Sequence, residues 1–233
     1  MQEKIKVIKE LLEYKEDIMP KSVWIVGGDG WAYDIGFGGL DHVLATGSNV
    51  NILVLDTEVY SNTGGQTSKS TNIGSVNKFA ITGCKQSKKN LAKYALTYEN
   101  VYVAQVSLGA NPNQVINAFK EAKEYNGPSI IIAYAPCIEH GLKNGMGTSE
   151  QETKEATLSG YFPIFRYNPI DKKFTLDSKA DFDKYEDFLM SEARYKVLEK
   201  TNPFEKDMLI EKNKEEAINR YEFYKNKMEK NNG

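Results

Sequence analysis

A single carboxylate, Asp29, stands between two glycines directly after an apolar run near the start of the chain (SVWIV, 22–26). Magnesium prefers six oxygen ligands, commonly one or two carboxylates together with phosphates and water. Asp29 can supply the carboxylate, and Gly28 and Gly30 let the backbone approach a phosphate because no Cβ stands in the way. A helix that begins after Gly30 would also direct free N–H groups toward that phosphate. This loop therefore predicts a site for magnesium and a diphosphate.

The remaining ligands are expected in a polar loop that follows the next apolar run, VNILVL at 50–55. The hydroxyl of Thr57 and the backbone carbonyl of Val59 are oxygen donors of the kind that magnesium accepts. Asn62 and Thr63 add neutral groups that can reach the diphosphate. Because Gly-Asp-Gly is also a common turn sequence, the prediction depends on the two loops together.

These loops must be held by a sheet, and the chain carries the pattern of one. Apolar runs that read as strands alternate with amphipathic stretches that read as helices. The alternation indicates an α/β fold with a mainly parallel sheet and helices on both faces. Ligands of such sheets bind beyond the carboxyl ends of the strands. The expected strands are 22–26, 50–55, 101–106 and 129–134, and the expected helices are 31–46, 91–98 and 112–125, the last capped by Asn111.

The two ends of the chain differ in composition from its middle. Residues 3–17 have apolar residues at helical spacing among Lys and Glu, which predicts a helix that stops before Pro20. Residues 176–233 are rich in charged residues, with apolar ones again at helical spacing. We expect an α/β domain at 1–175 and a charged helical extension at 176–233, made of one short and one long helix, and no second domain.

Composition excludes several classes of partner. The chain has 233 residues, 30 of them basic and 32 acidic, so no excess of positive charge is available to neutralise a nucleic acid. No apolar run approaches the roughly 20 residues of a membrane-spanning helix, and the charged N-terminus lacks the apolar core of a signal peptide. The two cysteines form no Cys-x-x-Cys pair. We therefore expect a cytoplasmic, reducing compartment and no disulfide framework.

Longer strings around the two loops resemble a known family. Asp29 and the polar loop about 28 residues later are similar to the binding motif of thiamine-diphosphate enzymes. GGDGWAYDIGFGGLDHVLA (27–45) and DTEVYSNTGGQTSKST (56–71) resemble the C-terminal thiamine-diphosphate domain of pyruvate:ferredoxin (flavodoxin) oxidoreductases. The resemblance continues through AYAPCIEHGL, GYFPIFRYNP and FTLDSKA, so it covers most of the chain.

The resemblance implies roles for individual residues. Asp29, the Thr57 side chain and the Val59 carbonyl fall on the magnesium ligands. Most thiamine enzymes have an asparagine where this chain has Thr57, and the oxidoreductase branch shares this departure. Trp31 is equally suited to core packing and to a cofactor contact. The contacts to the diphosphate and the thiazolium ring fall on Gly28, Gly30, Trp31, Ser61 and Asn62.

The resemblance also makes Cys137 one ligand of a 4Fe–4S cluster, because it stands in the matching Ala-Tyr-Ala-x-Cys-Ile context. Such a cluster needs four thiolates, and this chain has only Cys84 and Cys137, so it cannot complete one alone. The alternative for Cys137 is a buried, inert thiol, and Cys84 has no assigned role. His140 forms a Cys-x-x-His pair with Cys137, but one pair is too few for zinc. His42 is expected to be a packing or surface residue.

The activity that the resemblance implies is oxidative decarboxylation of pyruvate to acetyl-CoA. It would use thiamine diphosphate, Mg²⁺, the iron–sulfur cluster and coenzyme A, and pass electrons to ferredoxin or flavodoxin. The family's usual Cys-x-Gly-Cys segment is absent here, and the resemblance places the glutamate that activates the cofactor on another domain, so the catalytic residues are not assigned on this chain. We expect a fragment that needs its remaining domains or partner subunits, forms a homodimer when complete, and is inactive in isolation. Two alternatives remain: a non-catalytic binding module and a non-oxidative 2-oxoacid decarboxylase.

Overall fold

A computed structural model of the chain describes residues 2–15 and 21–231. Its centre is a six-stranded sheet with the order β1-β2-β6-β5-β7-β8. The first four strands in this order are parallel, and β7 and β8 extend the sheet in antiparallel fashion. The strands are β1 (Trp24–Gly28), β2 (Asn51–Asp56), β5 (Tyr102–Val106), β6 (Ser129–Tyr134), β7 (Phe165–Asn168) and β8 (Lys173–Leu176).

The four parallel strands are those expected from the apolar runs. The first begins two residues later than expected and continues through Gly28, so that Asp29 follows the strand directly. The antiparallel strands β7 and β8 were not predicted. They are only four residues long and lie between prolines and charged residues, and their aromatic side chains are buried on a sheet that is formed mostly by distant parts of the chain.

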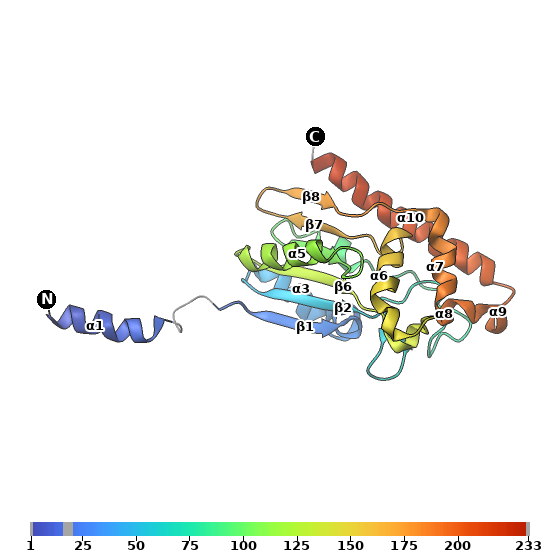
Figure 1. Cartoon of the computed structure of the whole chain (residues 1–233), viewed down its shortest axis with the longest axis horizontal. Helices are drawn as coiled ribbons and strands as arrows, with labels where there is room; N and C mark the ends of the chain where they lie inside the picture. Colours follow the sequence, from blue (N-terminus) through green and yellow to red (C-terminus); the bar gives the residue numbers. More distant parts are fainter. Residues whose placement is uncertain (1, 16–20, 232–233) are drawn as a thin grey trace.

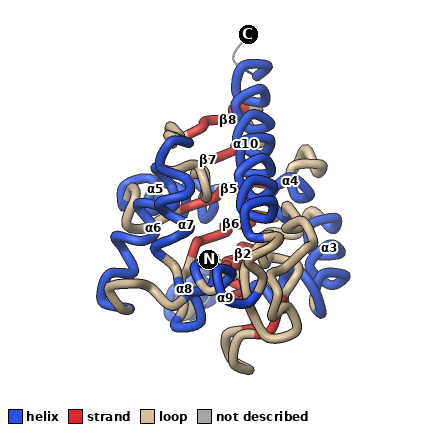
Figure 2. Tube along the Cα trace, turned by 90° about the vertical axis from the view of Figure 1, so that its right-hand side faces the viewer, coloured by secondary structure: helices blue, strands red, loops and turns tan. Residues whose placement is uncertain are grey.

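Helices cover both faces of the sheet, as predicted (Figures 1 and 2). The helices α3 (Phe37–Thr46) and α4 (Leu91–Ala95) lie on one face, and α5 (Pro112–Glu124) and α6 (Ser149–Leu158) lie on the other. The buried apolar residues form two hydrophobic clusters, and the smaller one packs β5 and β6 against α5. The side chain of Asn111 accepts a hydrogen bond from the backbone N–H of Gln114 and caps α5 as expected.

The helix expected at 31–46 is broken into two. A π-helical turn, η1 (Gly30–Ile35), precedes α3, and Gly36 separates them. The backbone N–H of Gly36 donates to the carbonyl of Trp31 at 2.8 Å, the five-residue span of a π turn. A Cβ on Gly36 would lie 2.2 Å from the Trp31 indole, so only glycine lets the indole fold over the break.

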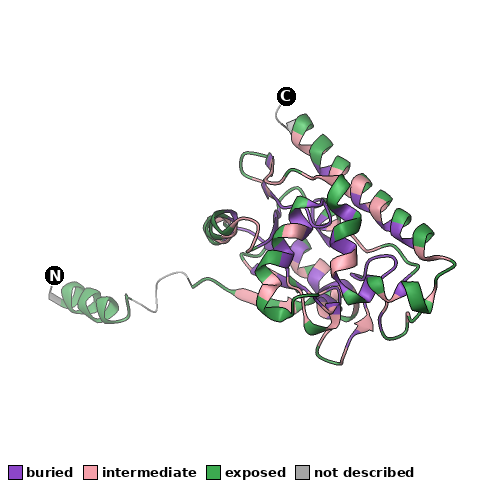
Figure 3. Ribbon diagram, turned by 45° about the vertical axis from the view of Figure 1, so that its right-hand side comes forward, coloured by how far each residue is buried: buried purple, intermediate pink, exposed green. Residues whose placement is uncertain are grey.

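The C-terminal region is more finely divided than the expected short and long helix. The turn η4 (Phe182–Lys184) is followed by α7 (Tyr185–Ser191), α8 (Ala193–Lys196) and α9 (Leu198–Thr201) before the long α10 (Lys206–Asn231). The expectation of a single short helix is wrong because Glu192 adopts an extended conformation that separates α7 from α8. The long helix is present, and Leu209, Ile210, Ala217 and Tyr224 of α10 belong to the main hydrophobic cluster. In Figure 3, buried and exposed residues alternate along this C-terminal helix.

The N-terminal helix α1 (Gln2–Glu13) is present but shorter than the expected 3–17, and residues 16–20, including the predicted stop at Pro20, lie outside the described residues. It stands apart from the sheet in Figure 1, with its apolar side chains exposed. Within the described residues, no helix has the length and apolar character needed to cross a membrane. The smaller elements are the hairpin β3 (Val59–Tyr60) with β4 (Gln66–Thr67), and the turns η2 (Ile138–His140) and η3 (Met146–Thr148).

Candidate functional site

The first two strands bring the predicted magnesium ligands together. Parallel β1 and β2 are in register from Trp24 opposite Asn51 to Gly28 opposite Leu55, so the loops after them begin at the same level of the sheet. Thr57 Oγ1 lies 2.8 Å from Asp29 Oδ1 and 3.0 Å from the carbonyl oxygen of Val59. The carboxylate, hydroxyl and carbonyl predicted from two separate loops thus converge on one point.

The three oxygens are a good fit for a cation. The Thr57 hydroxyl has one proton, which it can donate either to Asp29 or to Val59 but not to both. Ser61 in turn donates its own hydroxyl proton to Thr57 at 2.8 Å. While Asp29 is ionised, one of these two close pairs of oxygens is therefore without a bridging proton. A small ion that takes oxygen ligands, such as Mg²⁺, would satisfy all three groups.

The raised pKa of Asp29 also favours a cation beside it. The residue is 1% exposed, and burial together with the nearby charge of Asp56 raises the pKa of its carboxyl to about 6. Hydrogen bonds from Ser68 and Thr57 offset only part of this shift. A divalent cation beside Asp29 would favour the ionised form and compensate for the burial.

The glycines around Asp29 have different neighbours. A Cβ on Gly30 would lie 2.5 Å from the Tyr60 ring, whereas a Cβ on Gly28 would meet nothing closer than the Leu55 carbonyl oxygen at 3.9 Å. The absence of a side chain at Gly28 is therefore not required by packing within the chain. It leaves open backbone beside Asp29, where a phosphate could approach.

The other residues predicted to contact the cofactor differ in their distance from Thr57 and in their exposure. Ser61 contacts Thr57 at the base of the β3–β4 hairpin, while Asn62 and Thr63 are exposed at its turn. The Trp31 indole packs over Gly27 and beside the main hydrophobic cluster, which gives it a clear packing role. A cofactor contact by Trp31 or Asn62 remains a prediction.

Ser68 was not predicted, although it stands in the SKST string of the second loop. It is 7% exposed and donates its hydroxyl to Asp29 Oδ2 at 2.5 Å, so both carboxylate oxygens of Asp29 are engaged. Its signal in the sequence is weak because it lies 39 residues from Asp29 and outside the expected ligand positions.

Comparison with known proteins shows the family of the chain. The family model described as "Thiamine pyrophosphate enzyme, C-terminal TPP binding domain" matches residues 12–133, more than half of the chain. The chain belongs to this family. Thiamine pyrophosphate is the thiamine diphosphate of the sequence prediction, which is therefore confirmed at the level of the family.

Relatives of this thiamine pyrophosphate domain are much longer proteins. This chain is 49% identical over 228 residues to the pyruvate-flavodoxin oxidoreductase of Klebsiella pneumoniae, and the match covers 96% of this chain and 20% of the relative. It is 51% identical over 227 residues to the pyruvate:ferredoxin oxidoreductase of Moorella thermoacetica, covering 94% of this chain and 19% of the relative. The chain thus spans about a fifth of the length of these relatives. Their names favour the oxidoreductase over a non-oxidative decarboxylase.

A solved structure is also similar, the 2-oxoglutarate:ferredoxin oxidoreductase from Magnetococcus marinus with 2-oxoglutarate, coenzyme A and succinyl-CoA bound. The TM-score is 0.49 at 26% identity, and the match covers 55% of this chain and 43% of that chain.

The loop that carries Cys137 lies against the two loops that surround Asp29. Cys137 is half-buried after β6, and the next residues form η2. His140 Nε2 lies 2.8 Å from the Thr57 carbonyl oxygen, and a Cβ on Gly65 would lie 2.5 Å from the Glu139 carboxylate. Two residues of the Cys137 loop therefore contact the loops that surround Asp29.

The other ring nitrogen of His140, Nδ1, lies 3.4 Å from the Glu192 carboxylate. Among the described residues, no three or more His, Cys, Asp or Glu side chains cluster as metal ligands. Cys84 is buried and lies near the backbone of Gln86, and His42 is exposed.

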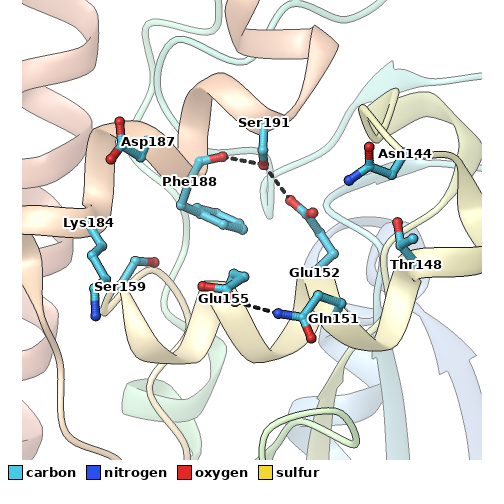
Figure 4. Close-up of a pocket in the computed structure, with 10 residues that line it drawn as sticks. All are labelled: Asn144, Thr148, Gln151, Glu152, Glu155, Ser159, Lys184, Asp187, Phe188 and Ser191. Atoms are coloured by element: carbon cyan, nitrogen blue, oxygen red, sulfur yellow. Dashed lines mark hydrogen bonds between the residues drawn. The ribbon is translucent and has the colours of Figure 1, made fainter.

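A separate hollow of about 400 Å³ opens between α6 and α7 (Figure 4), and none of the predicted site residues lines it. Acidic residues dominate its charged lining, with Lys184 as the basic one. Hydrogen bonds join several of its lining residues: the Ser191 hydroxyl contacts the Glu152 carboxylate and the Phe188 carbonyl, and Gln151 donates to Glu155 within α6. The residues that line it are Asn144, Thr148, Gln151, Glu152, Glu155, Ser159, Lys184, Asp187, Phe188 and Ser191.

Proposed function

We propose that this chain is the magnesium- and diphosphate-binding part of a pyruvate:ferredoxin or pyruvate:flavodoxin oxidoreductase, which converts pyruvate and coenzyme A to acetyl-CoA and carbon dioxide. The proposal depends above all on one observation. The Asp29 carboxylate and the Val59 carbonyl oxygen both lie within hydrogen-bonding distance of the Thr57 hydroxyl. The high identity to two oxidoreductases of this kind supports the reaction type.

The residues of this chain bind and orient the cofactor. Asp29, Thr57 and Val59 would hold Mg²⁺, and the open backbone at Gly28 would accept the diphosphate. Burial around Asp29 excludes water from the ion and strengthens its attraction to the phosphate oxygens. When bound, thiamine diphosphate supplies the electron sink that decarboxylation of a 2-oxoacid requires.

Cys137 would provide one thiolate to a 4Fe–4S cluster next to the cofactor. The contacts of Glu139 and His140 with the cofactor loops support this, because they fix the Cys137 loop beside the site. Three more thiolates must come from the rest of the enzyme. Electrons would leave through such clusters to ferredoxin or flavodoxin, in a homodimer located in the cytoplasm.

The chain alone would bind the cofactor without turnover, because the groups that activate the cofactor and bind pyruvate lie on other domains. Calorimetry with thiamine diphosphate and Mg²⁺, combined with an assay of pyruvate oxidation, tests this division of roles. Binding without turnover is expected, and turnover by this chain alone would contradict it.

The assignment of Asp29 is tested in the assembled enzyme with Asp29→Asn, which keeps the shape and removes the charge. We expect the Mg²⁺-dependent affinity for thiamine diphosphate to fall by more than about 100-fold, since even loss of an outer-shell group costs roughly 10- to 100-fold. Asp34→Asn is the matched control, because Asp34 lies in the π turn that follows Asp29, where its carboxylate contacts the backbone N–H and the ammonium group of Lys69. Unchanged binding by Asp29→Asn would show that the proposed site is wrong.

A further inference from the structure

Glu58 is the residue between two proposed magnesium ligands, and it faces away from them. Thr57 and Val59 direct their oxygens toward Asp29, while the Glu58 side chain is fully buried on the other side of the loop. A carboxylate with 0% exposure must be held by strong partners, because burial of an unpaired charge is very costly.

The backbone of Glu58 is in a strained conformation. Its φ is +58°, in the left-handed region that residues with a Cβ rarely adopt. Such a conformation persists only where the surroundings hold it. Here it reverses the chain between Thr57 and Val59, so that Thr57 Oγ1 and the Val59 carbonyl oxygen come within 3.0 Å.

The surroundings hold Glu58 through both carboxylate oxygens. Oε1 accepts from Lys88 at 2.7 Å and from Asn72 at 2.8 Å. Oε2 accepts from Tyr161 at 2.6 Å and from Arg194 at 2.7 Å. The Glu58 carbonyl also accepts from the hydroxyl of Thr71 at 2.6 Å. The strained turn is therefore fixed at its side chain and at its backbone.

Arg194 connects this turn to the C-terminal region. It lies in α8, 136 residues from Glu58, is almost fully buried, and also donates to Glu192 at 2.7 Å. Its backbone carbonyl accepts from the N–H of Val76. The segment that carries Arg194 is thus packed into the support of the second cofactor loop.

We infer that Glu58 and Arg194 are positioning residues of the magnesium site, whose ion pair holds the left-handed turn that presents Thr57 and Val59 to the metal. The inference rests on the proposed function, because it takes Mg²⁺ to bind at Asp29. It makes the C-terminal region, which lies outside the two cofactor loops, a determinant of metal affinity.

The test uses Glu58→Gln in the assembled enzyme, with calorimetric measurement of the Mg²⁺ concentration that gives half-maximal binding of thiamine diphosphate. We expect this concentration to rise roughly 10- to 100-fold, the usual effect of losing a group that orients a metal ligand. Glu58→Gly relieves the positive φ but removes the anchor, so it should show the same rise. Arg194→Lys keeps the charge and loses the planar fork, and a smaller rise is expected.

The control is Arg166→Gln, which breaks the ion pairs of Arg166 with Glu121 and Asp177 far from the loops. It should lower the unfolding temperature without changing the Mg²⁺ requirement. If Glu58→Gln does not assemble, Glu58→Gly and Arg194→Lys carry the same test. An unchanged Mg²⁺ requirement in folded variants of Glu58 and Arg194 would overturn the inference.

The Asp29→Asn variant distinguishes a failure of this inference from a failure of the proposed function. If it abolishes Mg²⁺-dependent binding while the Glu58 and Arg194 variants bind normally, only the positioning role is wrong. If Asp29→Asn itself binds normally, the proposed site is wrong.

Discussion

The pKa of a buried carboxyl group in this chain depends on whether a cationic side chain lies beside it. Asp29 and Glu58 are both buried carboxylates on two neighbouring loops. Burial raises the pKa of both, but at Glu58 the charges of Lys88 and Arg194 outweigh burial and hold the pKa well below its usual range. Asp29 forms no ion pair with a described residue, and the charge of Lys88 offsets burial only in part, so its pKa stays raised at about 6. The carboxylate without a protein cation is the one proposed to bind the metal.

Glu152 offers a test of burial on a carboxylate outside the cofactor loops. It is 8% exposed, lines the hollow of Figure 4, and accepts a hydrogen bond from Ser191 at 2.8 Å. Burial, together with the charge of Glu192, raises its pKa above 4.5. Between 4.5 and the raised pKa the folded chain binds more protons than the unfolded chain, so stability falls as pH rises through this window.

We therefore expect Glu152→Gln to be more stable than the wild type at neutral pH and to lose part of the pH dependence just above 4.5. Urea unfolding at a series of pH values measures both effects. Glu155→Gln, one turn along α6 and less buried, is the matched control. A Glu152→Gln variant that follows the wild-type pH profile would show that burial does not penalise this carboxylate.

At the scale of elements, the site depends on the loop at the carboxyl end of each strand. The loop after β1 needs glycine on both sides of Asp29, but for different reasons, since Gly30 lies under the Tyr60 ring and Gly28 faces open space. The sequence shows two equivalent glycines, whereas the structure separates a packing role from a binding role.

This difference predicts that alanine at Gly30 lowers mainly stability, whereas alanine at Gly28 weakens mainly cofactor binding. Gly30→Ala would place a Cβ 2.5 Å from the Tyr60 ring and should lower the free energy of unfolding by about 1–3 kcal/mol. Gly28→Ala should change it by less than about 0.5 kcal/mol, yet weaken thiamine diphosphate binding roughly tenfold, because its Cβ points into the space proposed for the diphosphate. Urea unfolding and calorimetry check the two expectations. Wild-type affinity in Gly28→Ala would remove Gly28 from the site.

For the whole molecule, the open question is whether the region after residue 175 is an appendage or part of one cooperative unit. The fully buried Tyr224 of α10 bears on it. Its ring lies 4.4 Å, between centroids, from Phe165 of β7 and 6.1 Å from Phe174 of β8. Its hydroxyl donates to Asn90, the residue that caps α4, at 2.9 Å. One side chain of the extension therefore contacts both the sheet and a helix of the α/β domain.

We expect Tyr224→Ala to lower the free energy of unfolding by about 3–5 kcal/mol while unfolding remains a single transition. Tyr224→Phe, which loses only the hydroxyl, should cost about 1 kcal/mol. Phe204→Ala is a surface control, because Phe204 is 99% exposed. Circular dichroism and tyrosine fluorescence should report the same transition. Separate melting of α10 before the sheet would instead support a boundary near residue 175.

Local order along the chain was enough to predict that Asp29, Thr57 and Val59 come together. Apolar runs marked the four parallel strands, and each loop oxygen follows its strand by a fixed number of residues. Because neighbouring parallel strands end at the same edge of a sheet, Asp29, Thr57 and Val59 could be brought together without knowledge of the three-dimensional structure.

The support of those loops became visible only in three dimensions. The anchor of Glu58 by Arg194 and the pairing of β7 with β5 depend on partners more than 50 residues away in the chain, which leave no periodic signal, and β8 in turn pairs with β7. The π turn after Asp29 depends on the Trp31 indole folding over Gly27 and Gly36, a packing choice that helical spacing does not reveal. Local patterns fix which groups come after each strand, whereas long-range packing fixes the conformation in which those groups are held.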